Sequence, residues 1–525
     1  MDSSLALSGR RALPGFGSLL IGCALLLGGC VSLPSLEQRT SSGALAPAVA
    51  AVTPLGRAVT AGVAAHPGLS GVHPLADAHE AFSVRVRMIQ AAQRTLDVQY
   101  YIWRDDITGT LLFQALRTAA DRGVRVRLLL DDNNTKGMDP VLAELEAHPS
   151  IELRLFNPFV VRGVRLWGFI TDFSRANRRM HNKSLTADNR VTLVGGRNIG
   201  DEYFGATSGL LFADLDILAV GPVVQAVSED FDRYWNSASS YPADRLLAES
   251  EPGEWRALDA ALALVHRNPG ARQYLALADG KGLAAALASG DYRLYWAPTR
   301  LVSDNPAKGL GEIPESQRAM VQLDALLGGA QRSLDIVSPY FVPTREDVSQ
   351  LTGLVRAGVR VRVLTNALEA TDVVAVHAGY SQWRVELLKG GVVLYEMKGN
   401  EGTPPGRRTA GPWGSASLSL HAKTIAVDNA VLAVGSFNMD PRSAHLNTEI
   451  GFVMQSPELA RAVSQAFRDR VPRSAYRVRL DEYGELYWVE QGKEGPTLYR
   501  HDPGSGLLKR MGVSILTWLP IEWML

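Results

Sequence analysis

Two copies of one chemical pattern lie 240 residues apart in this chain. In each copy a histidine is followed two positions later by a lysine and seven positions later by an aspartate. A glycine-containing segment then ends in an asparagine, seventeen positions after the histidine. The first copy consists of His181, Lys183, Asp188 and Asn198, and the second of His421, Lys423, Asp428 and Asn438. Two matches in register predict a phosphate-handling site built from two half-sites.

These residue types suit a phosphodiester, whose negative charge is spread over two non-bridging oxygens. Ammonium and amide groups that converge on one phosphate neutralise the charge that builds up in the transition state. Because imidazole titrates near neutrality, one histidine can attack phosphorus while the other, protonated, donates to the leaving alkoxide. We expect no cofactor and no metal, since the motif lacks the carboxylate or histidine cluster that would hold an ion.

A carboxylate is expected to orient each imidazole through its second ring nitrogen. Glu449 is the candidate partner of His421. The corresponding stretch of the first half makes Asp216 the partner of His181, with Asp214 as a close rival. The motif aspartates are expected to hold turns and adjacent side chains rather than to touch the substrate.

The surroundings of the motif are duplicated as well. Residues 93–98 match residues 331–336, and residues 123–127 match residues 358–362, at offsets of 238 and 235. In both halves amphipathic helices alternate with strands rich in valine and leucine, which indicates α/β units on a mostly parallel β-sheet flanked by helices. We therefore expect a duplicated α/β fold with the active site at the interface of the two copies.

Each motif is expected to fold as two strands joined by a tight turn. Residues 183–187 would pair with 191–194, and residues 423–427 with 431–434, with an Asp-Asn pair at each turn. A histidine and a lysine two positions apart lie on the same face of a strand. The spacing therefore aims both side chains at one point.

The N-terminus has the layout of an export signal. Two arginines precede an apolar run that ends in Leu27-Gly28-Gly29-Cys30, which resembles a bacterial lipobox. We expect residues 1–30 to be a signal peptide whose cleavage leaves Cys30 as a lipidated N-terminus, the alternative being an uncleaved anchor. Either way, we expect a protein of the bacterial cell envelope, held at a lipid surface and facing the periplasm. Inner versus outer membrane stays open.

Composition narrows the choice of partner and chemistry. The only cysteines are Cys23 and Cys30, so the remainder of the chain has no disulfide, no thiol nucleophile and no cysteine-bound zinc. The 54 basic and 54 acidic residues cancel to a net charge of zero. Non-specific nucleic-acid binding usually requires a positive excess, so no nucleic acid is expected as a partner.

The export signal, the local composition and the repeat together divide the chain into five parts. After the signal peptide, residues 31–76 are rich in Ser, Ala, Pro and Gly and are predicted to form a flexible tether. The first repeat with a helical connector is expected over residues 77–290, the second over 291–480, and a C-terminal tail over 481–525. The apolar end of the tail either dips into a membrane interface or packs on its own domain.

A basic and aromatic stretch directly precedes the first motif. Between Arg162 and Arg179, five arginines are interspersed with Trp167, Phe169 and Phe173. Two interpretations stay open, namely a solvated basic face and a contact with anionic lipid headgroups.

With these motifs the chain resembles the phospholipase D superfamily, whose signature is His-x-Lys-x4-Asp followed by Gly-Gly/Ser-x-Asn. The stretches 97–103, 128–134 and 194–201 are similar to those of the bacterial cardiolipin synthases within it. The resemblance implies duplicated phospholipase D-like domains and a phosphatidyl transferase that makes cardiolipin through a phosphohistidine at a bacterial membrane. It further implies that His181 is the nucleophile and His421 the acid/base.

The substrates implied are phospholipids, with phosphatidylglycerol as the acceptor and phosphatidylethanolamine as a further candidate. The need for an activating protein partner stays open. The same machinery would serve a phospholipase D that releases phosphatidic acid, since water and alcohol compete for one phosphohistidine. An envelope nuclease or a non-catalytic lipid-binding scaffold is less expected, because the export signal and zero net charge count against the first and the intact motifs against the second.

Overall fold

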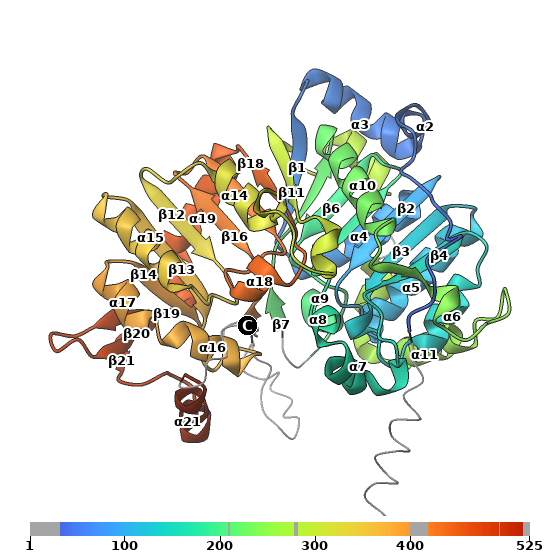
Figure 1. Cartoon of the computed structure of the whole chain (residues 1–525). Coiled ribbons are helices and arrows are strands. Elements are labelled where there is room, and N and C mark those ends of the chain that lie inside the picture. The colour runs from blue at the N-terminus through green and yellow to red at the C-terminus, as the bar shows by residue number, and fades with distance from the viewer. Residues whose placement is uncertain (1–31, 208–210, 278–281, 400–417, 493, 518–525) are drawn as a thin grey trace, which may run out of the picture.

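The computed structural model describes residues 32–207, 211–277, 282–399, 418–492 and 494–517. The chain forms two lobes side by side, the N-terminal lobe on the right and the C-terminal lobe on the left in Figure 1. The expected export signal with its two cysteines, and the last eight residues, lie outside the described residues. Within the described ranges, no helix has both the length and the apolar character needed to cross a membrane.

Each lobe is built on one large sheet. In the first lobe the strand order is β10-β1-β8-β6-β5-β2-β3-β4-β9, and in the second it is β11-β18-β17-β16-β12-β13-β14-β19-β20-β21. The strands of the first sheet are β1 (Ser70–Leu75), β2 (Thr95–Tyr100), β3 (Arg125–Asp131), β4 (Ile151–Phe156), β5 (Ser184–Ala187), β6 (Val191–Gly195), β8 (Asp216–Val220), β9 (Ser240–Pro242) and β10 (Tyr295–Ala297). Those of the second are β11 (Thr299–Ser303), β12 (Ser333–Val337), β13 (Arg360–Asn366), β14 (Val393–Met397), β16 (Thr424–Val427), β17 (Val431–Gly435), β18 (Ile450–Met454), β19 (Ala475–Leu480), β20 (Leu486–Gly492) and β21 (Gly495–Tyr499).

The duplication predicted from the sequence is confirmed by this order. The strands β8-β6-β5-β2-β3-β4 of the first lobe are neighbours in the same order as their equivalents β18-β17-β16-β12-β13-β14 in the second. The helices of the first lobe are α4 (Ala78–Ala91), α5 (Ile107–Asp121), α6 (Asp139–Glu146), α7 (Arg165–Thr171), α8 (Phe173–Ala176), α9 (Asp201–Phe204), α10 (Pro222–Trp235), α11 (Arg256–Arg267), α12 (Arg272–Leu277) and α13 (Leu283–Ser289). Those of the second are α14 (Ala319–Leu327), α15 (Arg345–Arg356), α16 (Val374–Ser381), α17 (Arg384–Lys389), α18 (Pro441–His445), α19 (Pro457–Asp469), α20 (Val471–Ser474) and α21 (Leu507–Leu516).

The α/β class is confirmed, but the sheets are mixed rather than mostly parallel. Within the described parts of the two large sheets, parallel pairing is confined to the neighbours β2, β3 and β4 and to their counterparts β12, β13 and β14. Helical crossovers join these strands, which allows parallel pairing. The motif strands β5 and β6 instead form a hairpin, as do β16 and β17, and hairpin strands are antiparallel. The hydrophobic pattern does not distinguish these two arrangements when both faces of a strand are buried.

The two predicted motif turns are confirmed. Asp188 and Asn189 have φ of 50° and 51°, and Asp428 and Asn429 have φ of 54° and 55°, as a tight two-residue turn between hairpin strands requires. The carboxylate of Asp188 accepts hydrogen bonds from the backbone N–H groups of residues 93–95, at the start of β2. Asp428 does the same at the start of β12. Both motif aspartates therefore fix the hairpins to the central sheet.

An apolar core shared by both lobes holds them together. Helix α10 packs on the inner side of the first sheet, and α19 packs on β16 and β17 of the second. Their side chains join those of β6 and β8 and of β17 and β18 in a single cluster that includes Val194, Ile217, Leu432 and Phe452. Because both motif hairpins border this cluster, the ends of the two hairpins are brought to one place.

Residues 32–76 are not the flexible tether that their composition predicts. They contain α2 (Pro47–Ala51), α3 (Pro54–Ala65) and β1, which pairs with β8 and β10 inside the first sheet. The stretch before α2 lies on the first lobe because arginine side chains donate to its backbone carbonyls. Arg154 donates to Thr40 and Arg127 to Ser42, at 2.6 and 3.0 Å. Small polar residues permit this close backbone approach, and the resulting order comes from the partner surface rather than from the segment itself.

Two predicted domain borders also shift. Strand β10 belongs to the first sheet, so the first lobe extends a few residues beyond 290. Strands β20 and β21, placed in the tail by the sequence, extend the second sheet, and α21 packs on α16. The connector between the lobes is helical, as predicted, with α11, α12 and α13 packed on the helices of the first lobe.

Candidate active site

Each motif histidine is anchored on the opposite lobe. The short strands β7 (Leu211–Ala213) and β15 (Leu418–Leu420) pair in parallel between the lobes. The backbone N–H of His421 donates to the carbonyl of Ala213 at 2.8 Å, and that of His181 donates to the carbonyl of Thr448 at 2.9 Å. Each lobe therefore supplies backbone contacts that hold the motif histidine of the other, and neither half-site is complete within one lobe.

This exchange reverses the carboxylate pairing expected from the sequence. Glu449 contacts His181, not His421, with Oε2 at 2.8 Å from Nδ1. Asp214, the rival candidate, contacts His421, with Oδ2 at 2.5 Å from Nδ1. In both pairs the carboxylate engages Nδ1, which leaves Nε2 as the ring nitrogen available for chemistry. The carboxylates therefore orient the imidazoles as predicted, but each acts across the lobe interface.

The sheet register explains why Asp216 is the wrong counterpart of Glu449. Gly195 pairs with Asp216 in the first sheet, and its equivalent Gly435 pairs with Gly451 in the second. Asp216 thus corresponds to Gly451, and Asp214 corresponds to Glu449. The offset is 235 residues, the same as for the matching stretches 123–127 and 358–362. Asp216 therefore lies two residues out of register with Glu449, and a shift of two residues keeps a side chain on the same face of a strand.

Asp216 instead forms buried ion pairs that support the fold. Its carboxylate pairs with the buried guanidinium groups of Arg85 and Arg197, at 3.0 and 3.1 Å. Arg197 also donates to the carbonyl of Asp214 at 2.8 Å. The cluster holds the loop that carries Asp214, so Asp216 contributes to the site through the backbone and not through contact with His181.

Replacement of Asp216 and replacement of Asp214 should have different effects on stability and on activity. We expect Asp216→Asn to lower the free energy of unfolding by about 3–5 kcal/mol, because it removes the negative partner of buried guanidinium groups. Asp214→Asn should lower the free energy of unfolding by less and should lower catalytic turnover by about two to four orders of magnitude, because His421 loses its orienting carboxylate. Denaturant unfolding and turnover, measured on both variants, check this. Equal stability losses with equal activity losses would contradict the division of roles.

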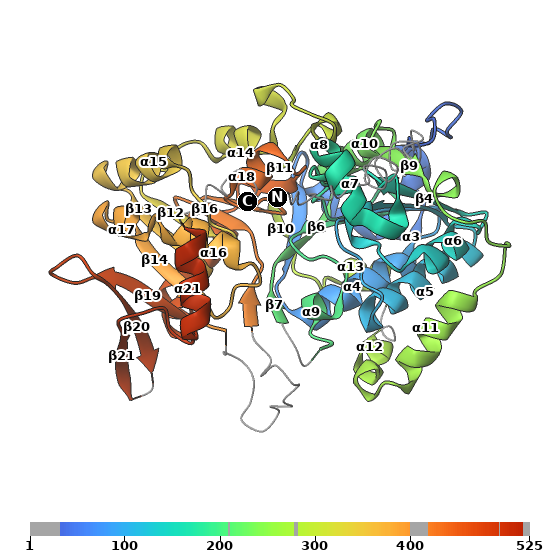
Figure 2. The ribbon, with the colours of Figure 1, turned by 60° about the horizontal axis from the view of Figure 1, so that its bottom comes forward.

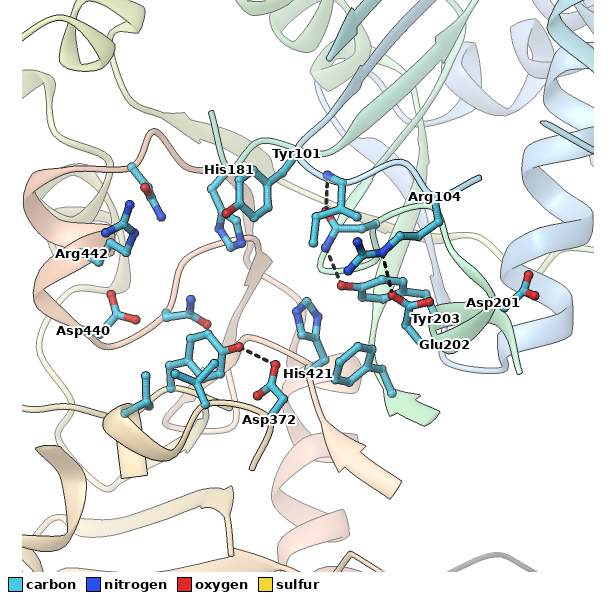
Figure 3. Close-up of a pocket in the computed structure, with 18 of the residues that line it drawn as sticks. Tyr101, Arg104, His181, Asp201, Glu202, Tyr203, Asp372, His421, Asp440 and Arg442 are labelled. Atoms are coloured by element: carbon cyan, nitrogen blue, oxygen red, sulfur yellow. Dashed lines mark hydrogen bonds and ion pairs between the residues drawn. The ribbon is translucent and has the colours of Figure 1, made fainter. Parts of the chain in front are cut away.

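A cavity of about 820 Å³ lies between the lobes, and both imidazoles open into it. Figure 3 shows His181 and His421 entering it from opposite lobes. Each histidine residue is 6% exposed, so the reacting nitrogens are accessible only from this cavity. The wall also includes Tyr101, Ile102, Arg104, Asp106, Asn198, Asp201, Glu202, Tyr203, Thr207, Phe212, Tyr340, Asp372, Val373, Val376, Asn438, Asp440, Arg442 and Asn447.

Both motif asparagines line the same cavity, and each motif lysine lies beside its own histidine. Lys183 and Lys423 are buried, and the ammonium group of each donates to the carbonyl of its own motif histidine. Asn198 is fixed by the backbone N–H of Ile102 and by its own donation to Tyr203. The side-chain Oδ1 of Asn438 has no hydrogen-bond partner within the described ranges of the chain. The unpartnered atom is an acceptor, so it suits a hydroxyl group of a ligand rather than a phosphate oxygen.

The electrostatics of the two imidazoles differ. Burial lowers the pKa of His181 well below its ordinary value, and the positive charges of Lys183 and Lys423 lower it further. Burial also raises the pKa of its partner Glu449 to about 7. His181 is therefore held as a neutral imidazole near neutral pH.

In the second pair, formed by His421 and Asp214, the pKa of the imidazole is lowered less than in the first. Burial and Lys423 lower the pKa of His421, but the Asp214 carboxylate opposes them. Burial alone would raise the pKa of Asp214, and the contact with His421 outweighs it and lowers that pKa below its ordinary value. Asp214 is thus ionised, and its charge keeps the pKa of His421 from falling as far as burial and Lys423 alone would lower it. Burial lowers the pKa of Lys423 to about 8, so its ammonium form still predominates at neutral pH.

Several cavity residues had no signal in the repeat pattern. Tyr340 donates to Asp372 at 2.7 Å, and both lie on the wall formed by the second lobe. Asp440 caps α18, and burial raises its pKa to about 6. Only the helix-start pattern Asp440-Pro441 was visible in the sequence, and it does not indicate a cavity. These residues have no identical counterpart in the first half, so the repeat does not mark them.

A family model, two proteins of related sequence and one solved structure match this chain over most of its length. The family model described as "Cardiolipin synthase, PLD-like domain" matches residues 86–235 and 323–471, one match in each lobe. The chain is 47% identical over 460 residues to cardiolipin synthase C of Escherichia coli (strain K12), covering 88% of this chain and 97% of that protein. It is 31% identical over 435 residues to an uncharacterized protein of Helicobacter pylori, covering 81% of this chain and 84% of that protein. The crystal structure of phosphatidylserine synthase from Haemophilus influenzae Rd KW20 shares the fold, with a TM-score of 0.54 at 14% identity over 90% of this chain and 100% of that one.

Proposed function

This chain belongs to the cardiolipin synthase family with phospholipase D-like domains, and we propose that it is a phosphatidyl transferase that makes cardiolipin from two phospholipids. The observation that carries the proposal is the pair of imidazoles that face one cavity, each oriented by a carboxylate of the opposite lobe. Two lysines and two asparagines surround them, which is the donor set for a phosphodiester.

In the first step, Nε2 of neutral His181 attacks the phosphorus of the donor phospholipid. The bond from phosphorus to the headgroup oxygen breaks, and protonated His421 gives its proton to that oxygen. The headgroup leaves as a free alcohol, and the phosphatidyl group stays on His181 as a phosphohistidine. The low proton affinity of His181 and the ionised partner of His421 support this division of roles.

In the second step, the glycerol hydroxyl of phosphatidylglycerol gives its proton to His421 and attacks phosphorus. The phosphorus–nitrogen bond breaks, cardiolipin is released and both histidines return to their starting states. The donor is phosphatidylglycerol or phosphatidylethanolamine, which would release glycerol or ethanolamine respectively.

Lipid product analysis tests the proposal. Purified protein is incubated in vesicles of phosphatidylethanolamine and phosphatidylglycerol, and the lipids are followed by mass spectrometry. Cardiolipin is the expected product, and the lipid that is consumed beside phosphatidylglycerol identifies the donor. Phosphatidic acid without cardiolipin would replace the proposal by a phospholipase D activity, with water as the acceptor.

We further propose that the protein is a lipoprotein of the bacterial envelope, acylated at Cys30 and facing the periplasm. The lipobox-like sequence at Leu27–Cys30 supports this. Stable anchoring needs more than one acyl chain, which lipoprotein processing supplies. Fractionation of cells labelled with a radioactive fatty acid checks the proposal, with Cys30→Ser as the control. Equal labelling of both proteins would contradict it.

A further inference from the structure

Large apolar side chains are exposed on two helical elements, one in each lobe. On α7 and α8 they are Leu166, Trp167, Ile170 and Phe173, and on α21 they are Leu507, Leu508, Met511 and Ile515. Ile170 is 68% exposed and Leu508 is 83% exposed. Monomeric proteins rarely leave such side chains grouped at the surface without a partner. We name these two groups the α7 face and the α21 face.

Both α7 and α21 pack against their own lobe on one side. Gly168 lies against the ring of Phe159, where a Cβ atom would come within 2.6 Å of the ring. Arg165 donates to the carbonyls of Asp132 and Asn133. On the other lobe, Val513 of α21 is buried in a cluster with Leu368 and Ala378. Each helix thus directs one apolar side inward and a second apolar side outward.

The two faces lie on the same side of the molecule. Both α7 and α21 are at the bottom in Figure 1, and both come forward when the bottom is turned toward the viewer in Figure 2. Each is one contact away from the active-site cavity. Helix α21 packs on α16, whose Val376 lines the cavity, and Asn177 at the end of α8 accepts from the cavity residue Arg442. The cavity therefore lies between the two faces.

Basic side chains lie beside the α21 face, since α21 contains Lys509 and Arg510 with no acidic residue. The arginines of residues 162–179 instead pair with carboxylates and carbonyls of the protein itself, as Arg162 does with Asp132 and Arg179 with Asp131. A surface that combines outward leucine, methionine and isoleucine with adjacent lysine and arginine matches the interface of an anionic bilayer, in which apolar side chains enter the acyl boundary and basic side chains meet phosphate groups. The α7 face adds further outward apolar side chains to this surface.

We propose that the α7 face and the α21 face dock together on an anionic lipid bilayer, so that the cavity between them opens onto the membrane surface. The inference rests on the proposed function, because a phospholipid must bring its phosphate to buried histidines while its acyl chains stay in the bilayer. Docking on both sides of the cavity lets the headgroup rise into the site without the chains crossing water. It also adds two contacts to the acyl anchor expected at Cys30 and sets the orientation of the cavity.

The first test reads insertion without using activity. Ile170→Cys, Leu508→Cys and the control Val52→Cys are made in the full chain with Cys23 and Cys30 replaced by serine, so that each variant has a single thiol. They are labelled with a fluorophore and reconstituted in vesicles of phosphatidylcholine and phosphatidylglycerol that carry bromine in the acyl chains. Val52 is 62% exposed and lies near α2 and α3, at the opposite side of the molecule. Fluorescence at positions 170 and 508 should be quenched, and that at 52 should not. Absence of quenching at both face positions overturns the proposal, as does quenching that depends only on protein concentration, since that would indicate contact between two copies.

The second test separates docking from the chemistry. The double variant Ile170→Glu, Leu508→Glu should turn over vesicle lipids at least about tenfold more slowly, because two apolar contacts with the bilayer are lost. Its turnover of dispersed short-chain phosphatidylglycerol should stay within about twofold, since neither side chain lines the cavity. Val52→Glu should change neither rate. An equal loss on both substrates would place the effect in the site or the fold and contradict docking. If the labels are quenched but the wild type makes no cardiolipin, the proposed function fails while the docking surface stands.

Discussion

Replacing His181 by alanine should abolish phosphatidyl transfer, lowering turnover by about four orders of magnitude or more. The alanine side chain has no nucleophilic nitrogen, and water cannot occupy the position of Nε2 with the orientation that Glu449 gives the ring. The fold should persist, because Glu449 keeps its hydrogen bonds from Ser436 and Ser443 when the imidazole is removed.

The measurement is cardiolipin formation by mass spectrometry, with thermal unfolding as a check on the fold. His266→Ala is the matched control, because this histidine is exposed on α11, away from the cavity. The control should retain the wild-type rate. Turnover of His181→Ala above about one per cent of the wild type would exclude His181 as the nucleophile and would point to attack by His421.

Replacing His421 by alanine should stop the reaction at the covalent intermediate when the donor has a good leaving group. With a natural donor, turnover should fall by about two to four orders of magnitude, because the leaving alkoxide receives no proton. With a p-nitrophenyl ester of phosphatidic acid the first step needs little acid assistance, since the leaving group is already stable as an anion. The second step still lacks its base. A phosphatidyl group should therefore accumulate on His181.

Peptide mass spectrometry under alkaline conditions, which preserve a phosphorus–nitrogen bond, checks this expectation. One equivalent of p-nitrophenol should be released rapidly and the modified peptide should contain His181. The double variant His181→Ala, His421→Ala should show neither the rapid release nor the modified peptide. A modification on another residue, or none at all despite release, would rule out the covalent route through His181.

The chemistry of the site was predictable because it resides in local spacing. A histidine and a lysine two positions apart must share a strand face, and the Asp-Asn pair must turn, so both hairpins follow from a few residues. The duplicated order of strands also followed, because repeated sequence folds into repeated structure. The crossed carboxylates did not follow. Offsets within the sequence relate one repeat to the other, but they do not state which repeat supplies the partner of a given histidine.

That choice is made by the pairing of β7 with β15 and by the backbone bond from His181 to Thr448. These are contacts of a few residues between segments that are 207 positions apart for β7 and β15 and 267 for His181 and Thr448, and no periodicity marks them. The stretch before α2 escaped prediction for a related reason. It becomes ordered because buried arginines of the first lobe bind its carbonyls, and this information lies in Arg127 and Arg154 rather than in the stretch itself.

The crossed pairing has an evolutionary consequence. If the repeats arose from an ancestral pair of identical chains, symmetry would have required the same carboxylate beside both histidines. Fusion into one chain removed that constraint, and here Glu449 supports one imidazole while Asp214 supports the other. The two histidines could then acquire different proton affinities, and the pKa of His181 is indeed lowered further than that of His421. Unequal carboxylate partners thus give two formerly equal halves different electrostatic surroundings within a single cavity.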